Sequence, residues 1–537
     1  MTGPRPIGGR KATSIGTFQP ILIASAVFMA VAWLTVFKQA MLVPLSHDEH
    51  QFVAAGRLLA GGMLPYRDFP SNHMPYLTLV YGAVFSLTQT SMLPARAVSA
   101  VCAALAASLV FHLTGSFFRD RSRPLRFIIS AAGSLTLITN PLFVYTSGRS
   151  WNHDLPTLFI VAAAALFLHR ESTRPTNKWI TASGVFVGLA AGARLTYVLT
   201  AIPFLLAISL QRGESVWKQR RSQWLAFGAG FLVASLPWIA LFVAAPRPFL
   251  FGNLTYQSLN TDYRELLSHR VGETLLGKGV YFFHVLVDKP ANLLLLLTFA
   301  IVALMVGFKI LRRRAWLESE AVILGGLALV LLVSAFAATP SWYQYFYGPV
   351  PFLILAALYG VSFVWQPGVI WGRAFAGGAV VLFLASGASL ISQSDWGSLR
   401  EPDKWIPVQA HQLGEELLRR AGHGKVLTLS PIFPIEGGLG TYKELATGPF
   451  SWRVAPLLTE RQRREFVVMS YSDLETTLRN DPPAAILVGF EAGNEGFELG
   501  DKGGLEDPLE DYARKHGYTA WPLKSQLTAA EVTLWVR

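Results

Sequence analysis

Two short polar clusters hold the residues that could do chemistry. The first is the run from Ser46 to His50 (Ser-His-Asp-Glu-His), and the second is the run from Ser147 to Asp154. Carboxylates are among the side chains that act as general acids and bases. Asp48 and Asp154 are therefore candidates for a functional role.

Glu49 allows two interpretations. The spacing Ser46-x-x-Glu49 matches a capping box, in which the serine and glutamate side chains each bond a free backbone N–H at the start of a helix. Acids are also stabilised at the positive end of any helix. Glu49 therefore either assists Asp48 or caps its helix, and Asp154 could in the same way only cap a helix that begins near Leu155.

His47 and His50 stand three residues apart with an acid between them, a spacing that could bring two metal ligands together. A third ligand at a fixed spacing does not accompany them, and metal sites in proteins are built from three or more ligands. The sequence therefore leaves the presence of a divalent metal open.

Arg194 is the most informative cation. It lies near the outer end of an otherwise apolar segment, where burying a charge costs roughly 2.5 kcal/mol or more unless an anion or water meets it. A lipid phosphate would supply that anion; the alternative is an arginine that reaches to the membrane interface or pairs with a helix-terminal carbonyl. His73 and Arg67 are further candidates for contacting the phosphate.

An aromatic stretch between Pro340 and Pro349 precedes another apolar segment. Trp and Tyr are typical of the membrane interface, and the same rings can flank a lipid or stack on a sugar. The candidate contacts to substrate or lipid are Trp342, Tyr345, Tyr347 and, from the second polar cluster, His153.

The elements that must position these residues belong to a membrane protein. Of the 537 residues, 52% are hydrophobic and only 15% charged, against roughly 25% charged in average soluble proteins. The mean hydropathy is +0.38. This composition excludes a collagen-like, disordered or disulfide-stapled protein, and the single Cys102 lies in an apolar run where it fits as a small core side chain. The net charge of +12 comes from short basic clusters between apolar segments, which indicates membrane topology rather than nucleic-acid binding.

The charge bias divides the chain into two parts. Residues 393–537 carry 16 Lys and Arg against 21 Asp and Glu, whereas residues 1–392 carry 30 against 13. We therefore expect a cytoplasmic N-terminal segment (1–20), a polytopic membrane domain (21–392) and an extracytoplasmic α/β domain (393–537), with the boundary at about 393–405. If every basic cluster is cytoplasmic, eleven membrane spans follow; they are expected at 21–45, 94–117, 127–146, 154–169, 179–196, 198–211, 224–245, 291–309, 320–338, 347–365 and 374–392.

Two outer loops are long enough to carry a site, at 44–94 and 245–290. The apolar run 75–87 is too short to span a membrane, so it is expected to form an interfacial or re-entrant helix. In the tail, helices are expected at 408–420 and 509–516, and strands at 425–430 and 484–489, as in a small α/β domain with a few parallel strands. The tail lacks a Gly-rich phosphate loop, so no nucleotide cofactor is expected.

The order of these motifs resembles a known family, the polytopic C-type glycosyltransferases that use polyprenyl-phosphate sugars. The similarity is greatest to the branch that contains the protein O-mannosyltransferases and the lipid A aminoarabinose transferase. The motifs that carry the resemblance are Asp48-Glu49, Tyr66-Arg67-Asp68, Asn72-His73-Met74-Pro75, Leu93 to Ser99, Asp154, Arg194, and Tyr345 to Pro349 with Pro351. Family members often have Lys where His73 and Arg194 stand.

The resemblance implies an α-helical integral membrane enzyme of the bacterial inner membrane, with a role in making a cell-envelope glycan such as lipopolysaccharide. It would move a sugar with inversion from a polyprenyl-phosphate carrier to a glycan, lipid or protein acceptor at the outer face. Asp48 would act as the base that takes the acceptor's proton, Asp154 would orient the acceptor or the base, and Arg194 and His73 would hold the phosphate. The alternative is a membrane transporter or lipid flippase with an acidic outer site. Transporters place their sites near the middle of the membrane and often have repeated halves, whereas here the polar residues gather at one face and no repeat is found.

Overall fold

The computed structural model describes residues 19–169, 176–211, 216–266, 274–313, 318–365, 370–392, 396–491 and 504–537. Nearly all of the predicted cytoplasmic segment 1–20 therefore lies outside the described residues. So do parts of three predicted basic clusters, which include Arg170, Arg212 and Arg314, and the first residues of the predicted boundary at 393–405.

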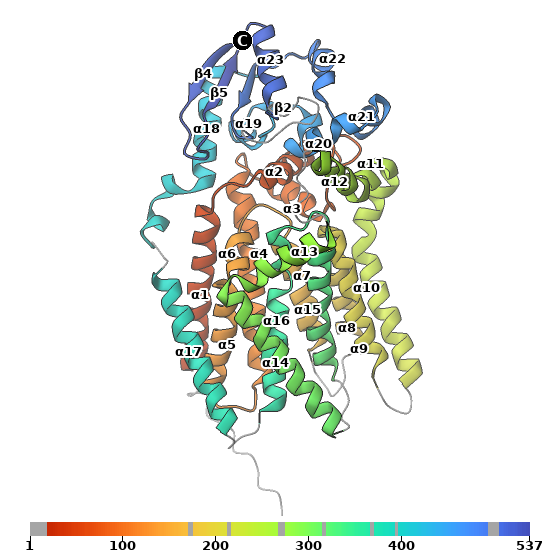
Figure 1. Ribbon diagram of the computed structural model, residues 1–537, viewed down its shortest axis with the longest axis vertical. Coiled ribbons are helices and arrows are strands. Elements are labelled where there is room, and N and C mark those ends of the chain that lie inside the picture. Colours follow the sequence, from red (N-terminus) through yellow and green to blue (C-terminus); the bar gives the residue numbers. More distant parts are fainter. Residues whose placement is uncertain are drawn as a thin grey trace, which may run out of the picture.

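A bundle of long helices forms the larger part of the molecule (Figure 1). The apolar runs become helices because a helix satisfies every backbone polar group within its own segment, as a membrane interior demands. Each predicted span overlaps a helix or a pair of helices: α1 (Gln19–Leu42), α4 (Met92–Phe117), α5 (Arg123–Ile138) with α6 (Pro141–Thr146), α7 (Asp154–Phe167), α8 (Asn177–Ala193), α9 (Ala201–Ser209) after the 3-10 turn η2 (Leu195–Thr200), α10 (Val216–Ala244), α14 (Pro290–Arg313), α15 (Ser319–Ala337), α16 (Val350–Val364) and α17 (Ile370–Ser392).

Six helical segments in the described ranges are long and apolar enough to cross a membrane, and the remaining apolar helices are shorter. This agrees with a multi-pass membrane protein. The number of eleven spans, and which ends face which side, stay predictions.

Short helices from the two long loops cover one end of the bundle. They are α2 (His47–Ala60), α3 (Tyr76–Phe85), α11 (Pro246–Leu250), the π-helical turn η3 (Phe251–Thr255), α12 (Tyr256–Leu266) and α13 (Leu275–Val287). In Figure 1, α2, α3, α11 and α12 lie between the bundle and the C-terminal part of the chain. The short helix expected at 75–87 is present as α3, which has 10 residues.

The C-terminal part contains a five-stranded sheet in the order β2-β1-β3-β5-β4. Its strands are β1 (Lys425–Leu427), β2 (Gly440–Thr441), β3 (Ala485–Val488), β4 (Thr519–Leu523) and β5 (Val532–Val536). The two strands expected from sequence correspond to β1 and β3, which pair in parallel. The expectation of parallel strands holds only for one half of the sheet, because β3–β5 and β5–β4 pair antiparallel. The helices around it include α18 (Ile406–Ala421), α19 (Ile432–Glu436), α20 (Pro449–Val454), α21 (Glu460–Phe466), α22 (Leu474–Leu478) and α23 (Asp507–Lys515).

The C-terminal part is tied to the bundle by a buried carboxylate. Glu436, at the end of α19, accepts hydrogen bonds from the backbone N–H groups of Ser91 (2.8 Å) and Met92 (2.6 Å) at the start of α4. The first N–H groups of a helix lack partners within it and attract negative charge. Glu436 thus caps a helix of the other part of the chain, and one hydrophobic core continues from α2 and α3 into α18 and α19.

Candidate active site

A cavity of about 750 Å³ lies where the loop helices meet the C-terminal part. Its walls come from the start of α2, the segment before α3, the segments before α7 and after α8, α12, the loop before α16, and α20. Seven residues predicted from sequence as site residues line it: His47, Asp48, His73, His153, Arg194, Trp342 and Tyr345. The other predicted residues, Glu49, His50, Arg67, Asp154 and Tyr347, lie outside its lining.

Asp48 lies in the first turn of α2, and Ser46 caps that helix by accepting a hydrogen bond from the Asp48 N–H (3.4 Å). The carboxylate is 21% exposed, and it has Nε2 of Gln344 at 3.5 Å and Nε2 of His47 at 3.7 Å. Burial raises the pKa of the Asp48 carboxyl, although His47 and Arg453 favour its charged form. A base whose pKa is raised toward neutral pH accepts a proton more readily.

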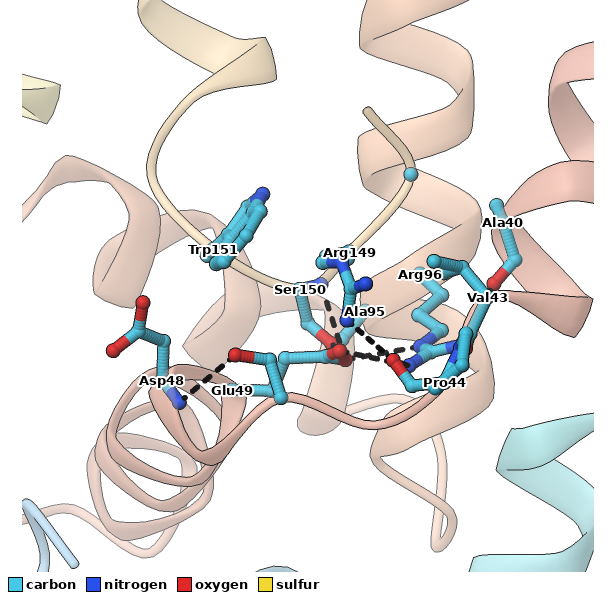
Figure 2. A network of polar contacts seen from close by, with 12 residues as sticks. Ala40, Val43, Pro44, Asp48, Glu49, Ala95, Arg96, Arg149, Ser150 and Trp151 are labelled. Atoms are coloured by element: carbon cyan, nitrogen blue, oxygen red, sulfur yellow. Dashed lines mark hydrogen bonds and ion pairs between the residues drawn. The ribbon is translucent and has the colours of Figure 1, made fainter. Parts of the chain in front are cut away.

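Glu49, the next residue, points elsewhere (Figure 2). Its two carboxylate oxygens lie 2.9 and 2.7 Å from Nε and Nη2 of Arg96 in α4, and both side chains are fully buried. Ser150 donates its hydroxyl to the same carboxylate at 2.9 Å, and Arg96 also donates to the carbonyls of Ala40 (2.9 Å) and Val43 (2.6 Å). Of the capping-box interpretation, the serine half holds, because Ser46 caps α2, and the glutamate half is wrong, because the Glu49 side chain is held by Arg96 instead of bonding back to Ser46.

Asp154 forms hydrogen bonds within the second polar cluster, the run from Ser147 to Asp154. Its carboxylate accepts from the hydroxyl of Ser147 (3.0 Å) and the N–H of Gly148 (2.8 Å). Gly148 has φ +84°, a conformation that favours glycine, and a Cβ there would lie 2.6 Å from that of Ala40. Asp154 is 1% exposed, so it orients the loop that carries His153 and does not face the cavity.

Arg194 is placed as the sequence predicts, directly after α8. Its Nη1 lies 2.9 Å from Nδ1 of His153, and its guanidinium carbon lies 4.2 Å from the centre of the Tyr345 ring. Burial and the charge of Arg194 lower the pKa of His153, so a neutral ring nitrogen accepts from the arginine. An arginine oriented by an imidazole and an aromatic ring, at the wall of a cavity, is a suitable ligand for an anion.

His73 and Arg67 differ from what the sequence suggests. His73 lines the cavity and stacks on Phe52 with 4.9 Å between ring centres. Burial and, next, the charge of Arg194 lower its pKa to about 3, so it offers a neutral N–H and not a cation. Arg67 is 53% exposed and pairs with Asp68 (2.7 Å) outside the cavity.

The structure does not pair His47 with His50 as metal ligands. His50 is buried, and its Nδ1 lies 3.4 Å from the N–H of Ile432 in the C-terminal part. Among the residues that the structure describes, no group of three or more His, Cys, Asp and Glu side chains is arranged to hold a metal ion.

The aromatic residues of the 340–349 loop divide between two roles. Trp342 and Tyr345 line the cavity, and Trp342 is 39% exposed there. Tyr347 is fully buried and does not line the cavity. Trp342 also stacks under the guanidinium of Arg264, whose carbon lies 4.7 Å from the ring centre.

Sequence reasoning missed two groups of cavity residues. One is the inner face of α12, where Tyr256, Gln257, Asn260, Tyr263 and Arg264 recur at intervals of three and four residues. That helical spacing was readable from the sequence. The other is Phe450 and Arg453 of α20, which reach the cavity from the C-terminal part and which nothing in the local sequence marks.

Comparisons with known proteins concern the fold of the chain and part of its sequence. Residues 72–240 match the family model described as dolichyl-phosphate-mannose-protein mannosyltransferase, a range that contains His73, Asp154 and Arg194. The fold is similar to that of ArnT from Cupriavidus metallidurans. The crystal structure bound to undecaprenyl phosphate has a TM-score of 0.57 at 14% identity, over 96% of this chain and 97% of that one. The apo crystal structure has a TM-score of 0.59 at 13% identity, over 96% of this chain and 98% of that one. No curated protein matches the chain. The predicted resemblance to C-type polytopic glycosyltransferases is confirmed.

Proposed function

We propose that this protein is a membrane glycosyltransferase that moves a sugar from a polyprenyl-phosphate carrier to an acceptor hydroxyl group. The observation that carries the proposal is one cavity lined by a half-buried carboxylate, Asp48, and by an oriented cation, Arg194. The undecaprenyl phosphate bound to ArnT, which has a similar fold, supports this choice of donor. Because the cavity lies at one end of the bundle, the arrangement favours an enzyme over a transporter with a site near mid-membrane.

Asp48 acts as the general base in this proposal. It takes the proton of the acceptor hydroxyl while the acceptor oxygen forms a bond to the anomeric carbon and the bond from that carbon to the phosphate oxygen breaks. Attack from the side opposite the leaving phosphate inverts the anomeric centre and needs no covalent sugar–enzyme intermediate. Gln344, whose amide lies 3.5 Å from the carboxylate, helps to orient Asp48.

Arg194 binds the phosphate of the donor and stabilises the charge that develops as it leaves. Groups oriented before the reaction are effective here because they need no rearrangement in the transition state. His153 and Tyr345 hold the guanidinium, and the neutral His73 adds a hydrogen bond. Asp154 positions the His153 loop, and Glu49 positions the helix of Asp48.

The proposed orientation of the protein in the membrane rests on the distribution of its basic clusters. With basic clusters on the cytoplasmic side, the C-terminal part and the cavity face the outer side of the bacterial inner membrane. The acceptor, a glycan, a lipid or a protein, would then reach the cavity from outside.

Binding and turnover of the purified protein test the proposal separately. A charge-assisted contact to phosphate contributes about 1.5–3 kcal/mol, so Arg194→Gln should weaken undecaprenyl-phosphate binding about ten- to hundredfold, and Arg194→Lys should weaken it less. Asp48→Asn should keep this binding and lower turnover by orders of magnitude. The matched control is Arg247→Gln, an arginine whose side chain is 71% exposed outside the cavity. Normal undecaprenyl-phosphate binding by Arg194→Gln would reject the phosphate role.

A further inference from the structure

Several cavity side chains are amides that have no hydrogen-bond partner among the described residues. Gln51 and Asn152 are only 6% and 4% exposed, yet both line the cavity. Gln257 and Asn260 are half-buried, lie one turn apart on α12 and line it as well. Within the described ranges, none of these four side-chain amides donates or accepts a hydrogen bond, and none is sealed from the cavity. A buried polar group without a partner costs free energy, so Gln51 and Asn152 are expected to bond something that enters the cavity, and Gln257 and Asn260 are open to the same ligand.

Other amides of the cavity wall are already engaged. Asn72 lies 3.3 Å from the hydroxyl of Ser451, and Asn253 donates to the carbonyl of Phe249 (3.0 Å). The unpartnered amides are therefore a distinct subset and not a general property of the wall.

The position of α12 is fixed by close contact with the loop that carries His73. Gly252, in the π-helical turn before α12, packs so closely that a Cβ there would lie 1.9 Å from the carbonyl oxygen of Ser71. Tyr256 and Tyr263 of α12 also pack against Val454 and Leu458 of the C-terminal part. The amides of α12 are thus presented to the cavity from a firmly held helix.

The charged residues of the cavity disfavour a sugar that carries an amine. Among its described lining residues, Asp48 is the only carboxylate, and the proposed reaction uses it as base. Three described arginines line it: Arg194 is assigned to the phosphate, Nη2 of Arg453 lies 3.5 Å from Oε2 of Glu491, and Arg264 stacks on Trp342. A sugar amine would therefore meet cations and no free acid, and its charge would be buried at a cost.

Side-chain amides can form hydrogen bonds in both directions with the hydroxyl groups of a neutral sugar. A sugar hydroxyl is both donor and acceptor, and an amide offers two N–H donors and a carbonyl acceptor. Trp342 adds an exposed aromatic face on which the apolar side of a sugar ring can lie.

We propose that Gln51, Asn152, Gln257 and Asn260 bind the hydroxyl groups of the transferred sugar, and that the cavity selects a neutral polyhydroxy sugar over an amino sugar. This inference rests on the proposed function and names the class of donor that it would use.

The test compares binding of three probes to the full-length purified protein. They are undecaprenyl phosphate alone, undecaprenyl phosphate linked to a neutral hexose, and undecaprenyl phosphate linked to an amino sugar. The neutral donor should bind about tenfold more tightly than the amino-sugar donor. Gln257→Ala and Asn260→Ala should each weaken its binding about three- to tenfold and leave undecaprenyl phosphate unchanged, because each removes hydrogen bonds to the sugar alone. Gln89→Ala, which removes an exposed amide outside the cavity, is the control.

The outcomes separate this inference from the proposed function. Equal or tighter binding of the amino-sugar donor, or unchanged binding of the neutral donor by both α12 variants, would overturn the inference while leaving a polyprenyl-phosphate enzyme in place. An equal loss for undecaprenyl phosphate alone would overturn it too, because the amides would then serve the lipid or the fold. If wild-type protein binds none of the three probes, the proposed function itself fails.

Discussion

Replacing Glu49 by glutamine tests whether this residue holds the site together or takes part in its chemistry. On the capping-box interpretation the change would be mild, because glutamine can still bond back to a helix N-terminus. The structure instead predicts that the change strongly destabilises the protein. Glu49 is the only carboxylate that meets the fully buried guanidinium of Arg96 among the described contacts, and it does so through two hydrogen bonds.

The expected loss in the free energy of unfolding is large because the buried guanidinium of Arg96 would lose its charged partner. Removing one member of a buried ion pair typically destabilises a protein by about 3–5 kcal/mol. The glutamine oxygen can still accept one hydrogen bond, so the destabilisation by Glu49→Gln should be near the lower end of this range, at about 3 kcal/mol. Replacing both charges, as in Glu49→Leu with Arg96→Leu, should cost less than the two single changes combined, although the carbonyls of Ala40 and Val43 then lose their donor at roughly 1 kcal/mol each.

Unfolding of the purified protein in detergent measures these differences, and the double-mutant cycle isolates the pair. Turnover supplies a second readout. As a positioning residue, Glu49 should lower kcat when changed to glutamine, while the acid limb of the pH profile, which belongs to Asp48, stays in place. A Glu49→Gln variant as stable as wild type, or one whose acid limb disappears, would refute this assignment.

Two further predictions concern other carboxylates. Because burial raises the pKa of Asp48 above its ordinary value of 3.8, activity should begin to fall on acidification at a higher pH than an exposed aspartate would give; an acid limb at or below pH 4 in kcat/KM would contradict this. The sign for stability follows from the same shift: the folded protein holds the proton more tightly, so this group's contribution to stability is lost as pH rises through the raised pKa. Glu436→Gln should weaken the cap on α4 by about 1–2 kcal/mol, and hydrogen exchange at Ser91 and Met92 should speed up; unchanged exchange would show that the cap contributes nothing.

The sequence predicts the helices well because their signal is local. An apolar run of about 20 residues has few alternatives to a helix in a membrane, so the expected spans at 94–117 and 320–338 differ from α4 and α15 by no more than two residues at either end. The strands β1 and β3 were predictable for the same reason. The antiparallel half of the sheet was not, because β4 and β5 are near the end of the chain and pair through contacts that no local pattern specifies.

The local sequence could not predict that Asp48 faces the cavity while Glu49 pairs with a buried arginine. Successive residues of a helix point about 100° apart, so two adjacent acids cannot serve one site in the same way. Which of them faces the cavity depends on Arg96, which lies 47 positions later and belongs to another helix. From sequence, Arg96 was only part of a short motif at the start of an expected span.

The C-terminal part changes what the cavity can recognise. The proposed base comes from the loop helix α2 and the proposed phosphate ligand from the end of α8, whereas Phe450 and Arg453 close one wall from α20. That wall is held in position because Glu436 caps α4 and Asn72 contacts Ser451, so the segment that carries His73 is linked directly to α20. Since the proposed chemistry needs only Asp48 and Arg194, while the fit of the substrate depends on the whole cavity, changes in α20 should alter the choice of substrate before they abolish transfer.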